Sequence, residues 1–384
     1  MKIVVKSILF IILFSLVTEA RAQFQINVSV DTVHNTLNKK IIRVLEDYFK
    51  VARTDSLARK FWVDEEVRTL KGFDLLKDIY SYTTSKDCMI LGIAKEREDV
   101  FRIKLMNESI GTDGKKTVYF ICNYIFYKKG DTFRIGNVLF WQLKADQYQQ
   151  LASKNITYHF PRNTHLPAQN VKLANRLLDN LQTFIGKKLD KKIDFYSANN
   201  CVDLYRLRGF DYYPGTMSSI TENNCGYTDD RNYLMYGDNS GYQKHELLRS
   251  ILFLCPDGAG VLKDGLVNLC GGSLGKPTTY HIKKLLPYLR DKPEVFKNIE
   301  DFYFFDEETV PSFVFNAVLV NYILKKEGPE KLKSLLKDSS LKYTTLSELL
   351  ERLYNIKDLS SFFLSEMARY EDGDRKLEYQ TLLD

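Results

Sequence analysis

Residues 245–249 read HELLR and place two chemically useful side chains side by side in a stretch with helical apolar spacing. A histidine on a helix can ligate a metal ion, and the glutamate beside it can accept a proton from a metal-bound water. Arg249 follows His245 by four residues, so a helix would present both side chains on one face. A guanidinium has no acceptor and keeps its charge in a protein, so Arg249 cannot ligate a metal.

Segments on both sides of HELLR carry further patterns. Residues 225–229 and 232–236 have the pattern of a glycine turn and a short strand, and residues 261–267 read VLKDGLV. Residues 311–314 read PSFV and residues 328–332 read GPEKL. In this order the segments resemble parts of the gluzincin, or peptidase-MA-like, zinc metallopeptidases. The matched parts are the turn and edge strand before the H-E-x-x-H helix, the W-L-x-E-G-L-A helix and a closing helix pair.

The resemblance covers about residues 155–355 and implies a role for each matched position. His245 stands at a zinc ligand and Glu246 at the general base. Asp264 stands at the third ligand, where the family has glutamate, and Arg249 replaces the second histidine. The resemblance therefore implies a vestigial site that is not expected to hold zinc. We expect a catalytically inactive, metallopeptidase-like protein that acts as a binding or assembly module for an unknown protein or peptide.

Two other functions stay open on the sequence alone. An active metallohydrolase or peptidase could use zinc, or a less demanding metal, on His245, Asp264 and an unidentified ligand. His159, His165 and His281 have no ligand spacing relative to His245. Alternatively, the N-terminal domain could bind a small ligand while the rest serves as scaffold. Without the neighbouring segments, His245 would be interpreted as an ordinary structural histidine.

Arg249 also predicts an arrangement of charges that needs no metal. It lies three residues after Glu246 and, in a gluzincin-like fold, faces Asp264. A guanidinium can neutralise carboxylates and form two parallel hydrogen bonds to one of them. We therefore expect Arg249 to pair with both Glu246 and Asp264.

Residues 1–22 have the features of a cleavable signal peptide. Lys2 and Lys6 flank the start of an apolar run that ends at Val17, and residues 20–22 read ARA. The apolar run is shorter than the roughly 20 residues of a membrane span, and no later segment is long and apolar enough to span one. We expect a mature chain that starts near Gln23, has no membrane span, and is periplasmic or secreted.

The composition excludes one class of partner. Loss of residues 1–22 removes three basic residues and one acid, which lowers the formal charge from +6 to +4. Basic and acidic residues are interleaved along the chain, so no nucleic-acid partner is expected. With 44% hydrophobic residues over 384 positions, the chain can form two domains with substantial cores.

The even number of cysteines allows disulfides in an oxidising compartment. The spacing favours three local pairs, and buried thiols are an equal alternative, since free cysteines are often buried. The three local pairs are Cys88 with Cys122, Cys201 with Cys225, and Cys255 with Cys270.

The apolar periodicity predicts helices followed by an antiparallel meander in the N-terminal part. Helices are expected over residues 38–53, 55–61 and 73–82, and strands over 89–94, 100–106, 117–127 and 132–143. This order resembles, in layout only, the cone-like nuclear-transport-factor and SnoaL-like domains. The fold hosts both enzymes and inert modules, so it implies no function.

The remaining chain mixes both periodicities before it becomes mostly helical. Strands are expected over residues 156–160, 192–197 and 233–236, with a helix over 170–186. The predicted fold class is α+β. The predicted organisation is a signal peptide over residues 1–22, a nuclear-transport-factor/SnoaL-like domain over 23–150 and a gluzincin-like domain over 151–384.

Overall fold

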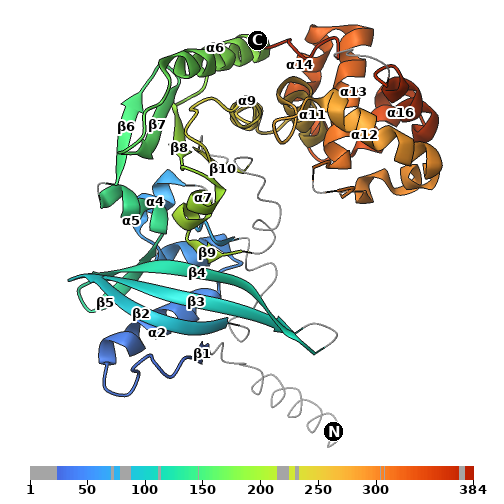
Figure 1. The fold of residues 1–384 in the computed structure, drawn as a ribbon. Helices are drawn as coiled ribbons and strands as arrows, with labels where there is room; N and C mark the ends of the chain where they lie inside the picture. The colour runs from blue at the N-terminus through green and yellow to red at the C-terminus, as the bar shows by residue number, and fades with distance from the viewer. Residues whose placement is uncertain are drawn as a thin grey trace, which may run out of the picture. The chain divides into compact units, whose positions relative to one another are not determined.

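The structure, a computed structural model, contains two compact units, each built from helices and one sheet (Figure 1). The α+β prediction is therefore confirmed. The first unit comprises Met1–Lys144 with Tyr205–Pro214, and the second comprises Ala145–Leu204 with Gly215–Asp384. The structure describes residues 24–70, 73–77, 88–110, 114–145, 147–213, 225–229, 233–302, 304–306, 308–371 and 377–384. The signal peptide predicted over residues 1–22 lies outside these ranges.

The sheet of the first unit has strand order β1-β2-β3-β4-β5, and β9 also pairs with β4. Its central strands form an antiparallel meander, as predicted, whereas β1 runs parallel to β2. Because β9 joins β4 from far along the chain, the first unit is not one continuous segment. The strands are β1 (Gln25–Ile26), β2 (Cys88–Arg97), β3 (Val100–Ile110), β4 (Lys116–Lys129), β5 (Thr132–Gly136) and β9 (Phe210–Tyr212).

Aromatic side chains fill the core of the first unit between its helices and the sheet. Trp62 is fully buried, and its ring centroid lies 5.7, 5.5 and 6.1 Å from those of Tyr48, Phe73 and Tyr124. Such edge-to-face arrangements add to the free energy of burial. The helices are α2 (Thr36–Phe49), α3 (Asp55–Ala58), η1 (Arg59–Phe61), α4 (Asp64–Thr69) and α5 (Val138–Lys144).

Two predictions for this unit were wrong in detail. The strand predicted over residues 132–143 ends at Gly136, and α5 follows it. A short apolar run fits a buried helix as well as a strand, so its periodicity could not separate the two. The helix predicted over residues 73–82 is a turn over residues 73–77, and its remainder lies outside the described residues.

The sheet of the second unit is mixed, with strand order β10-β11-β8-β7-β6. The strands β11, β8 and β7 run parallel, and β10 and β6 pair antiparallel at the two ends. Helix α6 (Ala168–Ile185) connects β7 to β8 and buries its apolar face in the core of this unit. The strands are β6 (Tyr148–Ala152), β7 (Ile156–Pro161), β8 (Ile193–Ser197), β10 (Gly226–Asp229) and β11 (Tyr233–Tyr236).

The rest of the second unit is helical, and α11 packs closely against α13. An added Cβ at Gly265 of α11 would lie 2.4 Å from the carbonyl oxygen of Asn316, so glycine permits this approach. The helices are α9 (Lys244–Leu248), α10 (Ile251–Leu254), α11 (Gly260–Gly271), α12 (Thr278–Asp291), η4 (Pro293–Asp301), α13 (Pro311–Glu327), α14 (Pro329–Lys337), η5 (Ser339–Leu341), α15 (Leu346–Tyr354) and α16 (Leu359–Ala368). A further helix, α7 (Cys201–Arg208), follows β8.

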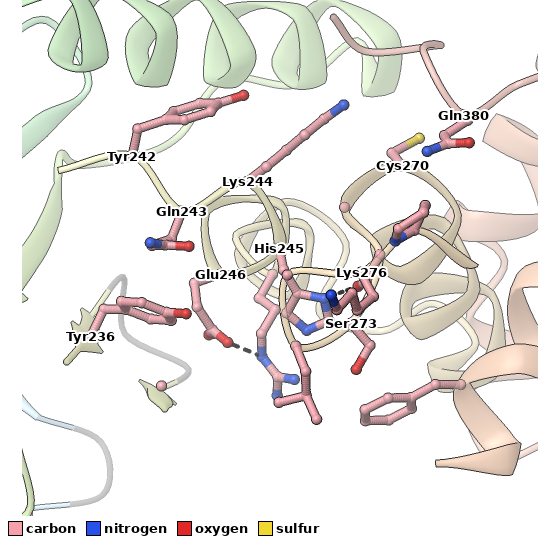
Figure 2. A pocket seen from close by; sticks show the side chains of 18 residues that line it. Tyr236, Tyr242, Gln243, Lys244, His245, Glu246, Cys270, Ser273, Lys276 and Gln380 are labelled. Carbon is pink, nitrogen blue, oxygen red and sulfur yellow. Dashed lines mark hydrogen bonds and ion pairs between the residues drawn. The ribbon is translucent and has the colours of Figure 1, made fainter. Parts of the chain in front are cut away.

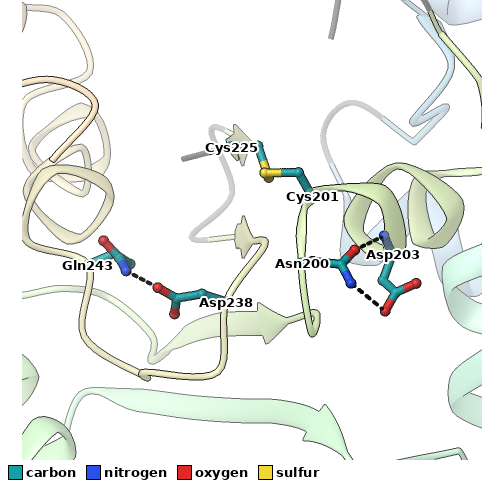
Figure 3. Close-up of a disulfide and its surroundings, with 6 residues drawn as sticks. All are labelled: Asn200, Cys201, Asp203, Cys225, Asp238 and Gln243. Atoms are coloured by element: carbon teal, nitrogen blue, oxygen red, sulfur yellow. Dashed lines mark hydrogen bonds between the residues drawn. A yellow bond between two sulfur atoms is a disulfide. The ribbon is translucent and has the colours of Figure 1, made fainter. Parts of the chain in front are cut away.

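One of the three local cysteine pairs is bonded. Cys201 and Cys225 form a disulfide with a Cα–Cα distance of 5.7 Å (Figure 3). The other cysteines are buried thiols: Cys88, Cys122, Cys255 and Cys270. No helix among the described residues is both long and apolar enough to cross a membrane.

Candidate functional site

The HELLR stretch forms the short helix α9 rather than one long buried helix. The amide of Arg249 donates to the carbonyls of His245 (3.2 Å) and Glu246 (3.1 Å), which ends the helix. A separate turn of helix, α10, follows. Leu247 and Leu248 are buried and fix one side of α9 in the core. His245 and Arg249 are therefore one helical turn apart, as predicted.

Backbone contacts fix the orientation of His245. Its Nδ1 lies 2.5 Å from the carbonyl oxygen of Gly272, at the end of α11. A carbonyl oxygen can only accept, so Nδ1 carries a hydrogen and Nε2 is the ring nitrogen left for another partner. An added Cβ at Gly271 would lie 2.8 Å from His245 Cα, so α9 and the end of α11 touch through their backbones.

The carboxylate of Glu246 lies against the edge strand β10. An added Cβ at Gly226 would lie 2.5 Å from Glu246 Cδ, so the carboxylate occupies the space beside this glycine. Glu246 Oε2 also lies 3.9 Å from Arg249 Nε, and the Glu246 side chain is only 13% exposed. This distance gives a long ion pair and no hydrogen bond. The predicted pairing of Arg249 with Glu246 is present in this long form.

The predicted pairing of Arg249 with Asp264 is wrong. Both residues are described, and no ion pair or hydrogen bond joins their side chains. Asp264 is half-buried on α11 and does not line the cavity described below. Burial raises the pKa of Asp264, and the nearby positive charge of Arg249 opposes this rise. Arg249 therefore acts on Asp264 through space only.

The side chains of α9 open onto a cavity of about 530 Å³ (Figure 2). Residues from β10, α9 and the loop after α11 line it, and Phe313 of α13 and Gln380 complete the wall. Its charged lining consists of three basic residues and one carboxylate: Lys244, Arg249, Lys276 and Glu246. Among these, Lys244 forms an ion pair with Asp384. A cavity of this volume is in the range that proteins use for ligands.

The glycine-rich loop after α11 (residues 271–277) was not singled out from the sequence. Gly272, Leu274 and Gly275 have positive φ angles of 68°, 48° and 72°, and the backbones of Ser273 and Lys276 pair across the turn. This conformation favours glycine, so the run of glycines was the one available signal. The loop brings Lys276 to the cavity.

The disulfide anchors the start of the edge strand. Cys225 directly precedes Gly226, and its partner Cys201 begins α7 (Figure 3). Between β11 and α9, the side-chain amide of Gln243 donates a hydrogen bond to the carboxylate of Asp238. The strand edge and the helix that face the cavity are thus each held at one end.

Among the described residues, the cavity has one histidine in its lining and no group of three zinc-ligand side chains. No three histidine, cysteine, aspartate or glutamate side chains among the described residues are arranged to hold a metal ion. His159 pairs with Asp194 at 3.0 Å, and buried His281 contacts Thr309 and the carbonyl of Ser273. Neither histidine lines the cavity. Arg249, which cannot be a ligand, lies one helical turn from His245 on the cavity wall.

Comparison of the chain with protein-family models, with curated proteins and with solved structures finds no match.

Proposed function

We propose that the second unit is a metallopeptidase-like module that binds an extended peptide without cleaving it. The support for a gluzincin-like arrangement is the order of its parts. The edge strand β10, the HELLR helix α9, helix α11 with Asp264, and the helix pair α13 and α14 follow one another as the resemblance implies. Helix α9 contacts β10, β11 and α11.

The observation that carries the proposal is Arg249 on the cavity wall, 3.9 Å from Glu246. A unit charge about 4 Å from a divalent ion costs roughly 8 kcal/mol at an effective dielectric constant near 20. Complete structural zinc sites bind with about 10–16 kcal/mol. A missing ligand and this repulsion together remove most of that affinity. The proposed module therefore works without catalytic zinc.

The edge strand supports an extended peptide as the ligand. In the described part of the sheet, β10 pairs with β11 on one side only. An unpaired strand edge can add a peptide strand through main-chain hydrogen bonds. The cavity beside Glu246 and Gly226 would then receive a peptide side chain or terminus. Export through residues 1–22 belongs to the same proposal, and cell fractionation with and without those residues tests it.

Zinc content tests the metal-free part of the proposal. The mature protein, its Arg249→His variant and an exposed control variant, Arg369→His, are loaded with zinc, dialysed and analysed for bound metal. We expect empty wild type, one zinc in Arg249→His, and none in Arg369→His. Stoichiometric zinc in the wild type would contradict the proposal. If Arg249→His stays empty as well, the gluzincin-like arrangement is wrong.

A further inference from the structure

We infer that the cavity beside α9 binds a carboxylate of the peptide through Arg249 and Lys276. This inference rests on the proposed peptide binding and names the group that the cavity recognises. It starts from the charges on the cavity wall. Three basic residues face one carboxylate there, and one of the three, Lys244, already pairs with Asp384. One positive charge is left in excess.

Arg249 has hydrogen-bond donors to offer. Its only ion pair among the described residues is the 3.9 Å approach of Nε to Glu246, which is too long for a hydrogen bond. The side chain is 33% exposed and lines the cavity. A guanidinium presents paired N–H groups that match the two oxygens of a carboxylate. A ligand carboxylate can therefore contact Arg249 without breaking a hydrogen bond inside the protein.

Lys276 is the second cation, and a fixed turn carries it. Its backbone exchanges two hydrogen bonds of 2.9 Å with Ser273, whose carbonyl also accepts from His281 Nε2 at 3.1 Å. In the described residues its ammonium makes no ion pair, and Nζ lies over the ring of Tyr280, 5.5 Å from its centroid. Figure 2 shows Lys276 and His245 at the same part of the cavity wall. The turn thus holds a cation ready for a ligand.

Glu246 reduces the positive charge that a ligand meets in the cavity. Its carboxylate lines the same cavity and lies beside Arg249. Two like unit charges about 4 Å apart repel by roughly 4 kcal/mol at an effective dielectric constant near 20, so Glu246 weakens the attraction of Arg249 for a ligand anion. Lys276 supplies the second positive charge that leaves the cavity attractive to an anion. The fitting ligand is a peptide with a C-terminal or side-chain carboxylate at this point.

The test compares three peptides on the full mature chain: acetyl-tetraalanine as free acid, the same peptide as C-terminal amide, and acetyl-Ala-Ala-Asp-Ala-amide. Amide chemical shifts of residues 271–276 follow the binding. We expect one of the two acids to bind at least tenfold tighter than the neutral amide. The preference should vanish in Arg249→Gln and fall about threefold in Lys276→Gln. Lys297→Gln, an exposed substitution on η4, should leave it unchanged.

The outcomes separate the two proposals. A stronger free acid assigns the site to a peptide C-terminus, and a stronger aspartyl peptide assigns it to an acidic side chain. Equal binding of all three overturns the carboxylate site and leaves peptide binding intact. Acetate that shifts the same amides in wild type and not in Arg249→Gln, with no peptide binding, supports the carboxylate site and overturns the proposed function. No binding of acetate or of any peptide overturns both.

Discussion

Glu66 in the first unit and Asp264 in the second are two carboxylates withdrawn from water, and the protein treats them differently. Glu66 is fully buried and accepts two hydrogen bonds from Asn137, of 2.7 and 2.8 Å. Burial raises its pKa to about 7 in spite of them. Asp264 is half-buried, and burial raises its pKa against the charges of Arg249 and Lys263.

The difference shows two ways to keep a carboxylate inside a protein. Around Glu66 the partners are neutral donors, which do not compensate a buried negative charge. Glu66 therefore keeps its carboxyl proton to a higher pH. Around Asp264 the partners are cations at longer range, so the charge itself is partly compensated. The first arrangement links stability to pH, and the second links it to Arg249. Each prediction below removes one of these elements.

The largest expected effect belongs to Glu66→Gln. The folded protein keeps the Glu66 proton from its ordinary pKa of 4.5 up to about 7. The unfolded chain has lost that proton in this window, so stability falls as the pH rises through it. The neutral amide removes this loss. We expect the variant to be about 3 kcal/mol more stable than wild type at pH 9 and about equal at pH 4.

Tryptophan fluorescence during chemical denaturation measures this effect selectively, because both tryptophans, Trp62 and Trp141, belong to the first unit. Glu65→Gln is the matched control on the same helix. Glu65 is exposed and pairs with Lys144 at 3.3 Å, so its replacement should change stability by less than about 0.5 kcal/mol. A parallel pH dependence in wild type and Glu66→Gln would contradict the account of Glu66.

The second prediction removes the cation near Asp264, so that this carboxylate loses a compensating positive charge. Arg249→Met keeps an unbranched apolar stem in place of the arginine side chain and removes its cation. We expect a loss of about 1–2 kcal/mol at pH 8, because Glu246 and Asp264 lose their compensating charge. The loss should shrink toward pH 4, because burial raises the pKa of Asp264 and its carboxyl group gains a proton there. Thermal unfolding followed by circular dichroism measures it, and a difference that stays constant from pH 4 to 8 would rule out the role of Arg249.

The fold was predictable where a pattern extends over several turns or strand residues. Helices α2 and α6 and the strands β2 to β4 follow their apolar periodicity closely. Short elements were not predictable. The sequence patterns did not predict β6, α7 or β9. In the described residues, β9 pairs with β4, more than 80 residues away in the chain. Tertiary pairing of this kind leaves little local signal.

The site was predictable to the extent that one helix carries it. His245 and Glu246 lie on α9 and Arg249 caps its C-terminus, so their spacing alone brings them together. Asp264 is on another helix and does not line the cavity, because the spacing of residues within one helix does not determine how two helices pack. Lys276 reaches the cavity through a turn with three positive φ angles. Such a turn is a property of the folded backbone, and only the glycines indicate it in the sequence.

A third prediction removes the charge of Asp264 itself. Its carboxylate makes no hydrogen bond within the described residues, so Asp264→Asn loses none. Because burial raises its pKa, the wild type loses stability as the pH rises above the ordinary value of 3.8. We expect a gain of less than about 1 kcal/mol at pH 8 and none below pH 4. Asp257→Asn is a control of opposite sign, because a hydrogen bond from Lys342 lowers the pKa of Asp257. Equal pH profiles of both variants would contradict the assignment.

The smallest change in stability is expected for Gly226→Ala, which acts on the partner of Arg249. The added Cβ would lie 2.5 Å from Glu246 Cδ, and the carboxylate can move because it ends a flexible side chain. We expect a loss of less than about 1 kcal/mol. The displaced carboxylate leaves Arg249 with less compensation, so the preference for acidic over amidated peptides should rise at least twofold. Gly260→Ala is the control, since an added Cβ there meets nothing within 4 Å. An unchanged or lower preference in Gly226→Ala would mean that Glu246 does not set the charge of this cavity.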